Sequence, residues 1–354
     1  MKKSLMALAM FGAFAGVAHA QTAVQIYGNV DEGFIKRSGQ TLNIGKRANS
    51  TLGFKGTEDL GNGLTALFQL EIRYEPDTGT VETGANNAQR PLFQGQSRVG
   101  LQGDFGMVRL GRGLTPFQDA IGGFEPWHGL PTPAGFYTDL SVAGYTSDPL
   151  SAAGNSGNRF SNAVWYNSPV FSGFQVNTAV GTKEGNGGPA LVGTGTTAAP
   201  QYAANAEASS NPFSVTTTYN NGPAAAMAAY ERNAVESKVW SLAGSLFATP
   251  ELKLMATYTR QDQGHTRLVN PKTKAWMLGA TYNLGPGKVL AGYGQKQPDG
   301  FVKTKQMSLG YEYSLSKRTY LYIDASRKKD PTSNFVASTP TTANFYDVGV
   351  NVGF

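Results

Sequence analysis

Apolar and polar positions alternate with a period of two along much of this chain. In residues 24–31 the even-numbered positions are apolar or small, and the odd-numbered positions are polar or amphipathic. Residues 66–74 and 348–354 repeat the alternation. Because successive side chains of a strand point to opposite faces, this pattern predicts strands that have one wet face and one dry face.

Short turns and long connections separate these segments in alternation. The short turns are rich in glycine, proline, asparagine and aspartate, as at residues 59–63, 104–106 and 220–223, which is typical of hairpins. The long connections are 75–91, 113–158, 181–211, 263–272, 297–303 and 328–343. This asymmetry is typical of an outer-membrane barrel, in which short turns face the periplasm and long loops face outward.

Sixteen strands fit between these turns and loops. The expected strands are 23–36, 47–58, 63–75, 92–104, 107–113, 158–168, 171–181, 212–220, 224–233, 238–248, 251–262, 273–284, 287–297, 303–315, 318–328 and 344–354. An even number suits a closed antiparallel ring. Closure is needed because lipid offers no hydrogen bonds to an open sheet edge. We therefore expect an all-β fold, a transmembrane antiparallel β-barrel of 16 strands.

The composition agrees with a barrel. Glycine accounts for 44 of 354 residues, and the mean hydropathy is only −0.28. A barrel has low hydropathy because only alternate residues face lipid. Aromatic residues at strand ends on the expected dry face would form interfacial girdles; they are Tyr74, Tyr166, Tyr219, Trp240, Tyr258, Trp276, Tyr282, Tyr311 and Tyr313. The alternative is that they fill the core of an ordinary sheet.

The first twenty residues resemble a secretory signal peptide. Lys2 and Lys3 precede an apolar stretch at 5–17, and Ala18-His19-Ala20 fits a cleavage site. We expect residues 1–20 to be removed and residues 21–354 to form one barrel domain. The chain has no cysteine, which excludes thiolate catalysis and thiolate zinc sites. Its net charge of +6 is spread out, so nucleic acid is not an expected partner.

Four segments resemble one family of proteins in their order and spacing. Residues 24–31 are similar to that family's first strand, 52–63 to its "LGFKGxEDLGxGL" hairpin, 103–112 to its "GxFGxVxLGRQ" hairpin and 159–169 to its "RxxNSVxYxSP" strand. The last four residues match only in Gly353 and Phe354. On these motifs the chain resembles the general diffusion porins of beta-proteobacteria, of the Neisseria, Bordetella and Burkholderia type.

This resemblance implies a water-filled channel in the outer membrane for passive diffusion of small hydrophilic solutes and ions. It further implies a homotrimer and a third loop that folds inward. Outer-membrane lipid, lipopolysaccharide and the barrel-assembly machinery are the other implied partners. Phe354 would form part of the assembly signal, although it would equally serve as a lipid-facing girdle residue. No cofactor is expected.

The alternation assigns the odd-numbered polar side chains of the first strands to a wetted lumen. In the resembling family, carboxylates on the third loop face arginines on the opposite wall, and opposed charges at a constriction set ion preference. The candidate constriction residues are Arg112 and Arg159, which match family arginines, Arg109, Lys55 and Glu71 by alternation, and the loop acids Asp119 and Glu125. Arg98 and Asp139 are further candidates. Each could instead be a solvated surface charge.

Two departures from the family reduce the expected positive charge of the wall. Thr51 stands where many relatives have arginine, and Asn29 stands where some have lysine. Arg109, Arg112 and Arg159 remain, so the hypothesis is a weak preference for anions.

Other function classes fit less well. A barrel enzyme would need a base near a nucleophile, but residues 21–354 contain only His128 and His265, both in expected loops. No metal-binding pattern is visible. A substrate-specific channel for a sugar or organic acid is the main alternative, since Tyr320 and Tyr322 share one strand face. A soluble lectin or adhesin is a further alternative.

Overall fold

The computed structural model describes residues 23–83, 90–150, 156–182, 210–262, 272–330 and 341–354. The expected signal peptide at 1–20 and the expected start of the domain at Gln21 lie outside these residues, as do parts of the expected long loops. The division of the chain at residue 20 therefore stays a prediction.

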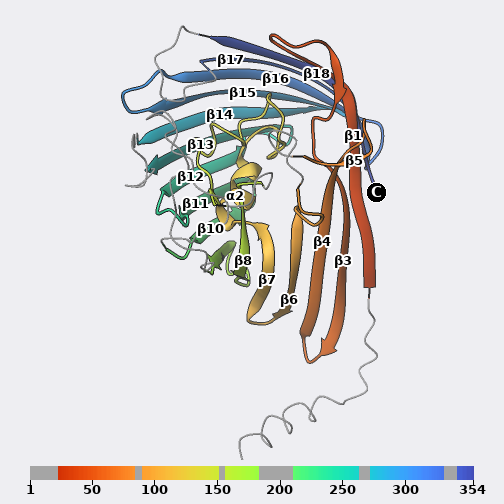
Figure 1. The fold of residues 1–354 in the computed structure, drawn as a ribbon, viewed down its shortest axis with the longest axis vertical. Helices are drawn as coiled ribbons and strands as arrows, with labels where there is room; N and C mark the ends of the chain where they lie inside the picture. Colours follow the sequence, from red (N-terminus) through yellow and green to blue (C-terminus); the bar gives the residue numbers. More distant parts are fainter. Residues whose placement is uncertain (1–22, 84–89, 151–155, 183–209, 263–271, 331–340) are drawn as a thin grey trace, which may run out of the picture.

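Sixteen long strands form one closed antiparallel ring in the described residues (Figure 1). They are β1 (Ala23–Arg37), β3 (Ser50–Gly61), β4 (Leu64–Glu75), β6 (Gln96–Gly103), β7 (Gly106–Leu114), β8 (Arg159–Asn167), β9 (Phe174–Gly181), β10 (Phe213–Asn221), β11 (Ala224–Arg232), β12 (Lys238–Phe247), β13 (Leu252–Asp262), β14 (Thr273–Leu284), β15 (Gly287–Pro298), β16 (Thr304–Ser314), β17 (Thr319–Lys329) and β18 (Thr342–Gly353). The ring closes because β1 pairs with β3 along residues 23–29 and with β18 along residues 29–37. The expected fold class is confirmed.

Four short elements were not expected from the alternation. Strand β2 (Asn43–Gly45) pairs with β1, and β5 (Thr80–Val81) pairs with β4. Helix α2 (Pro116–Ile121) and the 3₁₀ helix η2 (Gly122–Phe124) lie in the third loop. Two or three residues are too few to show a period, so alternation cannot reveal such strands.

The two faces of the ring have opposite character. On β1 and β16, for example, Val24 and Met307 point outward and are each 60% exposed, whereas Asp31 and Thr304 point inward and are buried. The nine aromatic residues expected at the interfaces all lie on the outward side of the cross-strand register. Apolar side chains outside and polar side chains inside are the reverse of the arrangement in a soluble protein. They suit a barrel that is surrounded by lipid and filled with water.

Among the helices that the structure describes, none has both the length and the apolar character needed to span a bilayer.

Residues 115–150 and 156–158 belong to the third loop, which we call loop 3, and they fold into the ring (Figure 1). Thr115 caps helix α2, because its Oγ1 accepts a hydrogen bond from the Gln118 N–H at 3.3 Å, and Pro116 occupies the first helical turn, where its missing N–H costs nothing. The loop then runs along the inner face of the wall from β10 to β17. The open part of the lumen is therefore bordered by the other wall, from β1 to β8.

Candidate functional site

Two apolar clusters hold loop 3 against the wall. Phe117, Ile121 and Tyr145 of the loop pack with Met227 and Val239 of the strands. Trp127, Phe136 and Leu140 pack with Met277 and Leu290 in a second cluster. Burial of aromatic and aliphatic side chains of this size contributes roughly 1.5–3 kcal/mol each. The loop is thus a packed layer of the barrel interior.

Glycines on the wall let the loop come close. A Cβ atom at Gly279 would lie 2.5 Å from Cγ of Pro126, and one at Gly292 would lie 2.4 Å from a ring carbon of Phe136. Both glycines point inward and face each other across β14 and β15. Any larger residue would push the loop toward the open lumen.

Hydrogen bonds to inward polar side chains fix the path of loop 3. The Thr259 hydroxyl donates to the Ser141 carbonyl at 2.7 Å, and the Gln306 amide donates to the Gly135 carbonyl at 2.9 Å. The Ser214 hydroxyl accepts from the Phe117 N–H at 3.2 Å. These side chains satisfy loop backbone groups that would otherwise be buried without partners.

Glu125 does not face the open lumen, contrary to the expectation for a constriction acid. Its side chain is fully buried, and its carboxyl group accepts hydrogen bonds from the backbone N–H groups of Trp127, Gly129 and Phe136 at 3.1, 2.6 and 3.3 Å. Burial raises the pKa of Glu125 to about 7, although the three N–H groups act in the opposite direction. Glu125 therefore holds a turn of loop 3 together.

Asp139 connects loop 3 to two strands. Its two carboxylate oxygens accept hydrogen bonds from Lys296 on β15 and Lys328 on β17. Burial alone would raise the pKa of Asp139, but the two ammonium groups outweigh it and hold the pKa below its ordinary value. Asp139 is consequently ionised at neutral pH and serves as an anchor for the loop.

Asp119 is the expected loop acid that meets solvent. It lies on the exposed side of helix α2, and its charge acts on Arg98 and Arg109 of the opposite wall. Arg98 donates two hydrogen bonds to the Gln69 Oε1, at 3.0 and 2.7 Å, and Arg109 donates one to the Asn167 Oδ1 at 2.6 Å. The structure thus brings an acid on the loop into opposition with two fixed cations.

Lys55 and Glu71 lie on the same wall as Arg98. The Lys55 ammonium group sits 5.2 Å from the centre of the Tyr27 ring, and the Tyr27 hydroxyl donates to the Glu71 carboxylate at 3.2 Å. Glu71 also lies 3.8 Å from the Arg73 guanidinium. These contacts keep the side chains folded against the wall.

Arg112 and Arg159 are held tightly where loop 3 leaves and re-enters the wall. Arg159 donates to the Gly95 carbonyl at 2.7 Å and to the Asn158 Oδ1 at 2.6 Å. Arg112 donates to the Ser161 hydroxyl at 2.6 Å. Both are nearly inaccessible to solvent, at 9% and 1% exposure respectively. Their positive charges therefore act on the lumen without direct contact with the solvent.

Arg73 and Arg90 complete the basic wall. Together with Arg159 they line a cavity of about 410 Å³ between the wall and loop 3 residues such as Tyr137. Arg90 donates to the Ser156 hydroxyl at 2.9 Å and pairs with Glu82 at 3.3 Å. The alternation of residues 69–73 places Arg73 in the lumen but does not mark it as a constriction residue. Arg90 lies next to a long loop, and no local pattern could have found it.

Tyr320 and Tyr322 do not form an open aromatic track. Tyr322 is only 2% exposed, and its hydroxyl donates to the Asp31 carboxylate at 3.0 Å. The Arg47 guanidinium covers the Tyr322 ring at 4.8 Å and pairs with Asp324 at 2.7 Å. Tyr322 belongs to a buried polar network and offers no aromatic surface to a sugar.

Groups that could hold a metal ion or act as a general base are scarce. In the residues that the structure covers, no cluster of three or more histidine, aspartate and glutamate side chains is placed to bind a metal. Burial and the charges of Lys288 and Lys253 lower the pKa of His128 to about 4, so this histidine is neutral at pH 7. His265 lies outside the described residues.

Phe354 closes the seam between the first and last strands. Its N–H donates to the Gly28 carbonyl at 3.0 Å, and the Gly28 N–H donates to its carbonyl at 3.2 Å. The ring is 45% exposed on the outside of the barrel, where a Cβ atom at Gly28 would meet it at 2.8 Å. Its position suits the expected girdle role.

Comparisons with known proteins agree with the fold and the polar lumen. A family model described as "Gram-negative porin" matches residues 5–333. The outer membrane porin protein 32 of Delftia acidovorans is 32% identical over 343 residues, which cover 91% of this chain and 88% of that protein. An outer membrane porin protein of Bordetella pertussis is 28% identical, with coverage of 93% and 95%.

Two solved structures share the architecture. An anion-selective porin from Comamonas acidovorans superposes with a TM-score of 0.74 at 24% identity, covering 94% of this chain and all of that one. The trimer form of OmpT, an outer membrane protein of Vibrio cholerae, superposes with a TM-score of 0.62 at 14% identity, covering 94% and 99%.

Proposed function

This chain belongs to the Gram-negative porin family and is a diffusion porin of the outer membrane, and we propose that its channel prefers anions weakly and works as a homotrimer. It is a channel and not an enzyme. The observation that carries the proposal is the distribution of charge around the open lumen. Six inward cations, Lys55, Arg73, Arg98, Arg109, Arg112 and Arg159, lie on the wall from β3 to β8. Asp119 on α2 opposes them.

Opposed charges of this kind create a field across the passage. Unpaired positive charge along one wall raises the local concentration of anions. Several cations are already partly balanced, since Glu71 lies near Arg73 and Glu82 pairs with Arg90. The preference should therefore be weak. The similarity to an anion-selective porin supports the same sign of selectivity.

The trimer is supported by the family. One of the similar structures is described as a trimer form. Phe354 would contribute to recognition by the barrel-assembly machinery, and residues 1–20 would be removed during export. Outer-membrane lipid and lipopolysaccharide would surround the trimer, and small hydrophilic solutes and ions would pass through it.

Single-channel recording in a planar bilayer tests this proposal. Purified, refolded protein should insert in conductance steps grouped in threes. Under a tenfold salt gradient, the reversal potential should have the sign of anion preference and remain well below the value of about 59 mV for an ideally selective pore. A reversal potential of the cation-selective sign would contradict the charge assignment, and independent single steps would contradict the trimer.

The Asp139 anchor predicts a change in the channel at acid pH. Because the folded-state pKa lies below the ordinary value of 3.8, the anchor is complete above that value and is lost as the pH falls through the folded-state pKa. Removing one partner of a buried ion pair costs about 3 kcal/mol or more. Asp139→Asn should therefore increase open-channel noise at pH 5, where the native channel should be quiet.

Recordings from pH 5 to pH 3 provide the comparison for this prediction. The native channel should become as noisy as the variant only in the most acid solutions, while the variant should change little. If Asp139→Asn and the native protein have equal noise at pH 5, the two lysine contacts do not restrain loop 3.

A further inference from the structure

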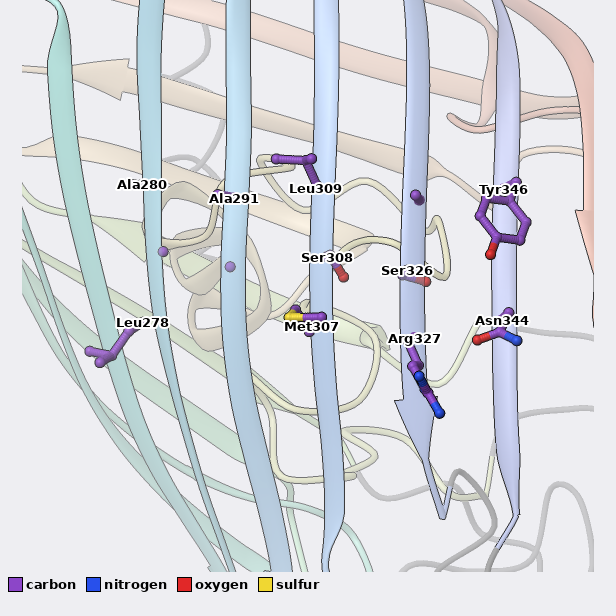
Figure 2. Close-up of a pocket in the computed structure, with 13 residues that line it drawn as sticks. Leu278, Ala280, Ala291, Met307, Ser308, Leu309, Ser326, Arg327, Asn344 and Tyr346 are labelled. Atoms are coloured by element: carbon purple, nitrogen blue, oxygen red, sulfur yellow. The ribbon is translucent and has the colours of Figure 1, made fainter.

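The outer face of the barrel carries an apolar groove across β14–β18. Its volume is about 800 Å³. Figure 2 shows labelled residues that line it, among them Leu278, Met307 and Tyr346, on the strands that border the groove. These side chains lie on the lipid side of the register, so the groove is separate from the lumen and from the proposed constriction.

The groove arises from small side chains in one row of the sheet. Ala280 faces Ala291 across β14 and β15, and Ala325 on β17 lies between Leu309 and Tyr346 of its neighbours. Three of the four positions from β14 to β17 in this row are alanine, so a furrow lies on either side of Leu309. A furrow of this kind on a lipid-facing surface accepts extended hydrocarbon without loss of polar contacts.

Cations gather at one end of the groove. Lys305 on β16 lies directly opposite Lys329 on β17, and Arg327 lies two residues before Lys329 on the same outward face. Directly opposed side chains on one face have Cβ atoms only about 5 Å apart, and like charges in such pairs are destabilising. Three cations in this arrangement would be stabilised by an anion between them.

The described strands around these cations supply no such anion. The outward positions of β14–β18 contain no aspartate or glutamate. Within the described part of the chain, Lys305, Arg327 and Lys329 form no ion pair. Lys238 on β12 offers a contrast, because its cross-strand neighbour on β13 is Asp262. A ligand from outside the chain would supply the partner that the described residues do not provide.

The position of the cations indicates the depth of that partner. They lie at the strand ends that lead into the long loops, which face outward in an outer-membrane barrel. The rings of Trp276 and Tyr293, with centres 5.7 Å apart, lie in the same two cross-strand rows as the cations. Aromatic residues are typical of the membrane interface. The three cations therefore lie at the headgroup level of the outer leaflet, and the alanine row lies at the level of the acyl chains.

We propose that this groove binds a phosphorylated, acylated glycolipid of the outer leaflet, with a phosphate between Lys305, Arg327 and Lys329 and an acyl chain along the alanine row. The chemistry at both ends fits one molecule. Phosphate matches the unpaired cations, and guanidinium and ammonium groups are strong phosphate donors. Hydrocarbon matches the furrow below them.

A second copy of the chain is a poorer occupant of this groove. Subunit interfaces have cores that are depleted of charged residues, whereas this groove ends in three exposed cations. A second copy would have to bring acidic side chains to meet these cations. Loss of the trimer when the groove is filled would identify a second copy as the occupant.

Lipid binding to the purified full-length barrel tests the proposal. The probes are rough-type lipopolysaccharide and the same preparation after enzymatic removal of its phosphates, with binding measured by native mass spectrometry. The triple variant Lys305→Gln/Arg327→Gln/Lys329→Gln should bind the phosphorylated probe about a hundredfold more weakly, since each cation near an anionic lipid surface contributes severalfold. Ala291→Phe, which fills the furrow, should weaken binding about tenfold and leave the cations in place.

Lys238→Gln is the matched control, because it removes an outward cation from the same rim and should leave binding unchanged. Channel conductance should be native in all these variants, since none of the side chains faces the lumen. Three outcomes would overturn the proposal. These are unchanged binding by the triple variant, equal binding of the dephosphorylated probe, and loss of the trimer in Ala291→Phe, which would identify the groove as a subunit interface.

Discussion

Replacing Arg98 and Arg109 by glutamate is expected to reverse the sign of the reversal potential, from weak anion preference to clear cation preference. Both guanidinium groups point into the lumen opposite Asp119 of helix α2. Each is only partly buried, so its charge reaches the passing ions. With two glutamates in their place, acids would stand on both sides of the passage.

The size of the effect follows from simple electrostatics. A unit charge about 10 Å from an ion contributes roughly 0.4 kcal/mol in a medium as polar as water. The double substitution changes the wall by four charges, or about 1.7 kcal/mol, which is more than tenfold in ion preference. The reversal potential under a tenfold salt gradient is therefore expected to shift by tens of millivolts. An ideally selective pore would give about 59 mV.

Arg260→Glu/Lys274→Glu is a suitable control for this experiment. Arg260 and Lys274 face each other on the outward side of β13 and β14, so this variant has the same change in net charge without a change in the lumen. Its reversal potential should be native. If the control shifts as much as Arg98→Glu/Arg109→Glu, selectivity arises from the overall charge of the barrel and not from the constriction.

Glu125→Ala is expected to loosen loop 3, which would raise the conductance and the open-channel noise. The substitution leaves the N–H groups of Trp127, Gly129 and Phe136 buried without acceptors. Each unsatisfied buried donor costs about 1–3 kcal/mol. The sixteen strands do not depend on this turn, so the barrel should still fold and resist heat in detergent.

Glu125→Gln separates hydrogen bonding from charge. Glutamine keeps one acceptor oxygen, which can serve the N–H groups of Trp127 and Phe136, and it is uncharged like the protonated acid. A folded-state pKa raised from 4.5 to about 7 means that the contribution of Glu125 is complete below pH 4.5 and is lost as the pH rises through 7. The native channel should therefore become noisier between pH 5 and pH 8, and Glu125→Gln should show no such change. A native channel with constant noise over this range would show that the carboxyl group is not buried as the structure has it.

The strands and their inward and outward faces follow from local properties of the sequence. Alternation over 8 to 15 residues marks a strand, and short glycine-rich turns mark its ends. The expected bounds of β14, 273–284, match the observed element, and those of β1 and β4 differ by one residue. The same alternation places Lys55, Glu71 and Arg98 on the lumen side, because one face of each strand must meet lipid.

The path of loop 3 could not be read from its residues. Its partners lie far away in the chain, as shown by the bond from Thr259 to Ser141, 118 residues apart, and that from Gln306 to Ala134, 172 residues apart. These contacts exist only after the ring has closed. For this reason Glu125 and Asp119, which look alike as loop acids, end in opposite environments, one buried and one exposed.

Alternation by itself determined that this chain forms a barrel with an apolar outside and a charged inside, because the period of a strand is a property of neighbouring residues. Only the tertiary structure decided which charges meet in space. It placed Arg90 and Arg159 around one cavity and Asp139 between two lysines. It also gathered Lys305, Arg327 and Lys329 at the end of a groove. Burial and charge pairing depend on contacts between distant strands and a folded loop, and no single segment contains that information.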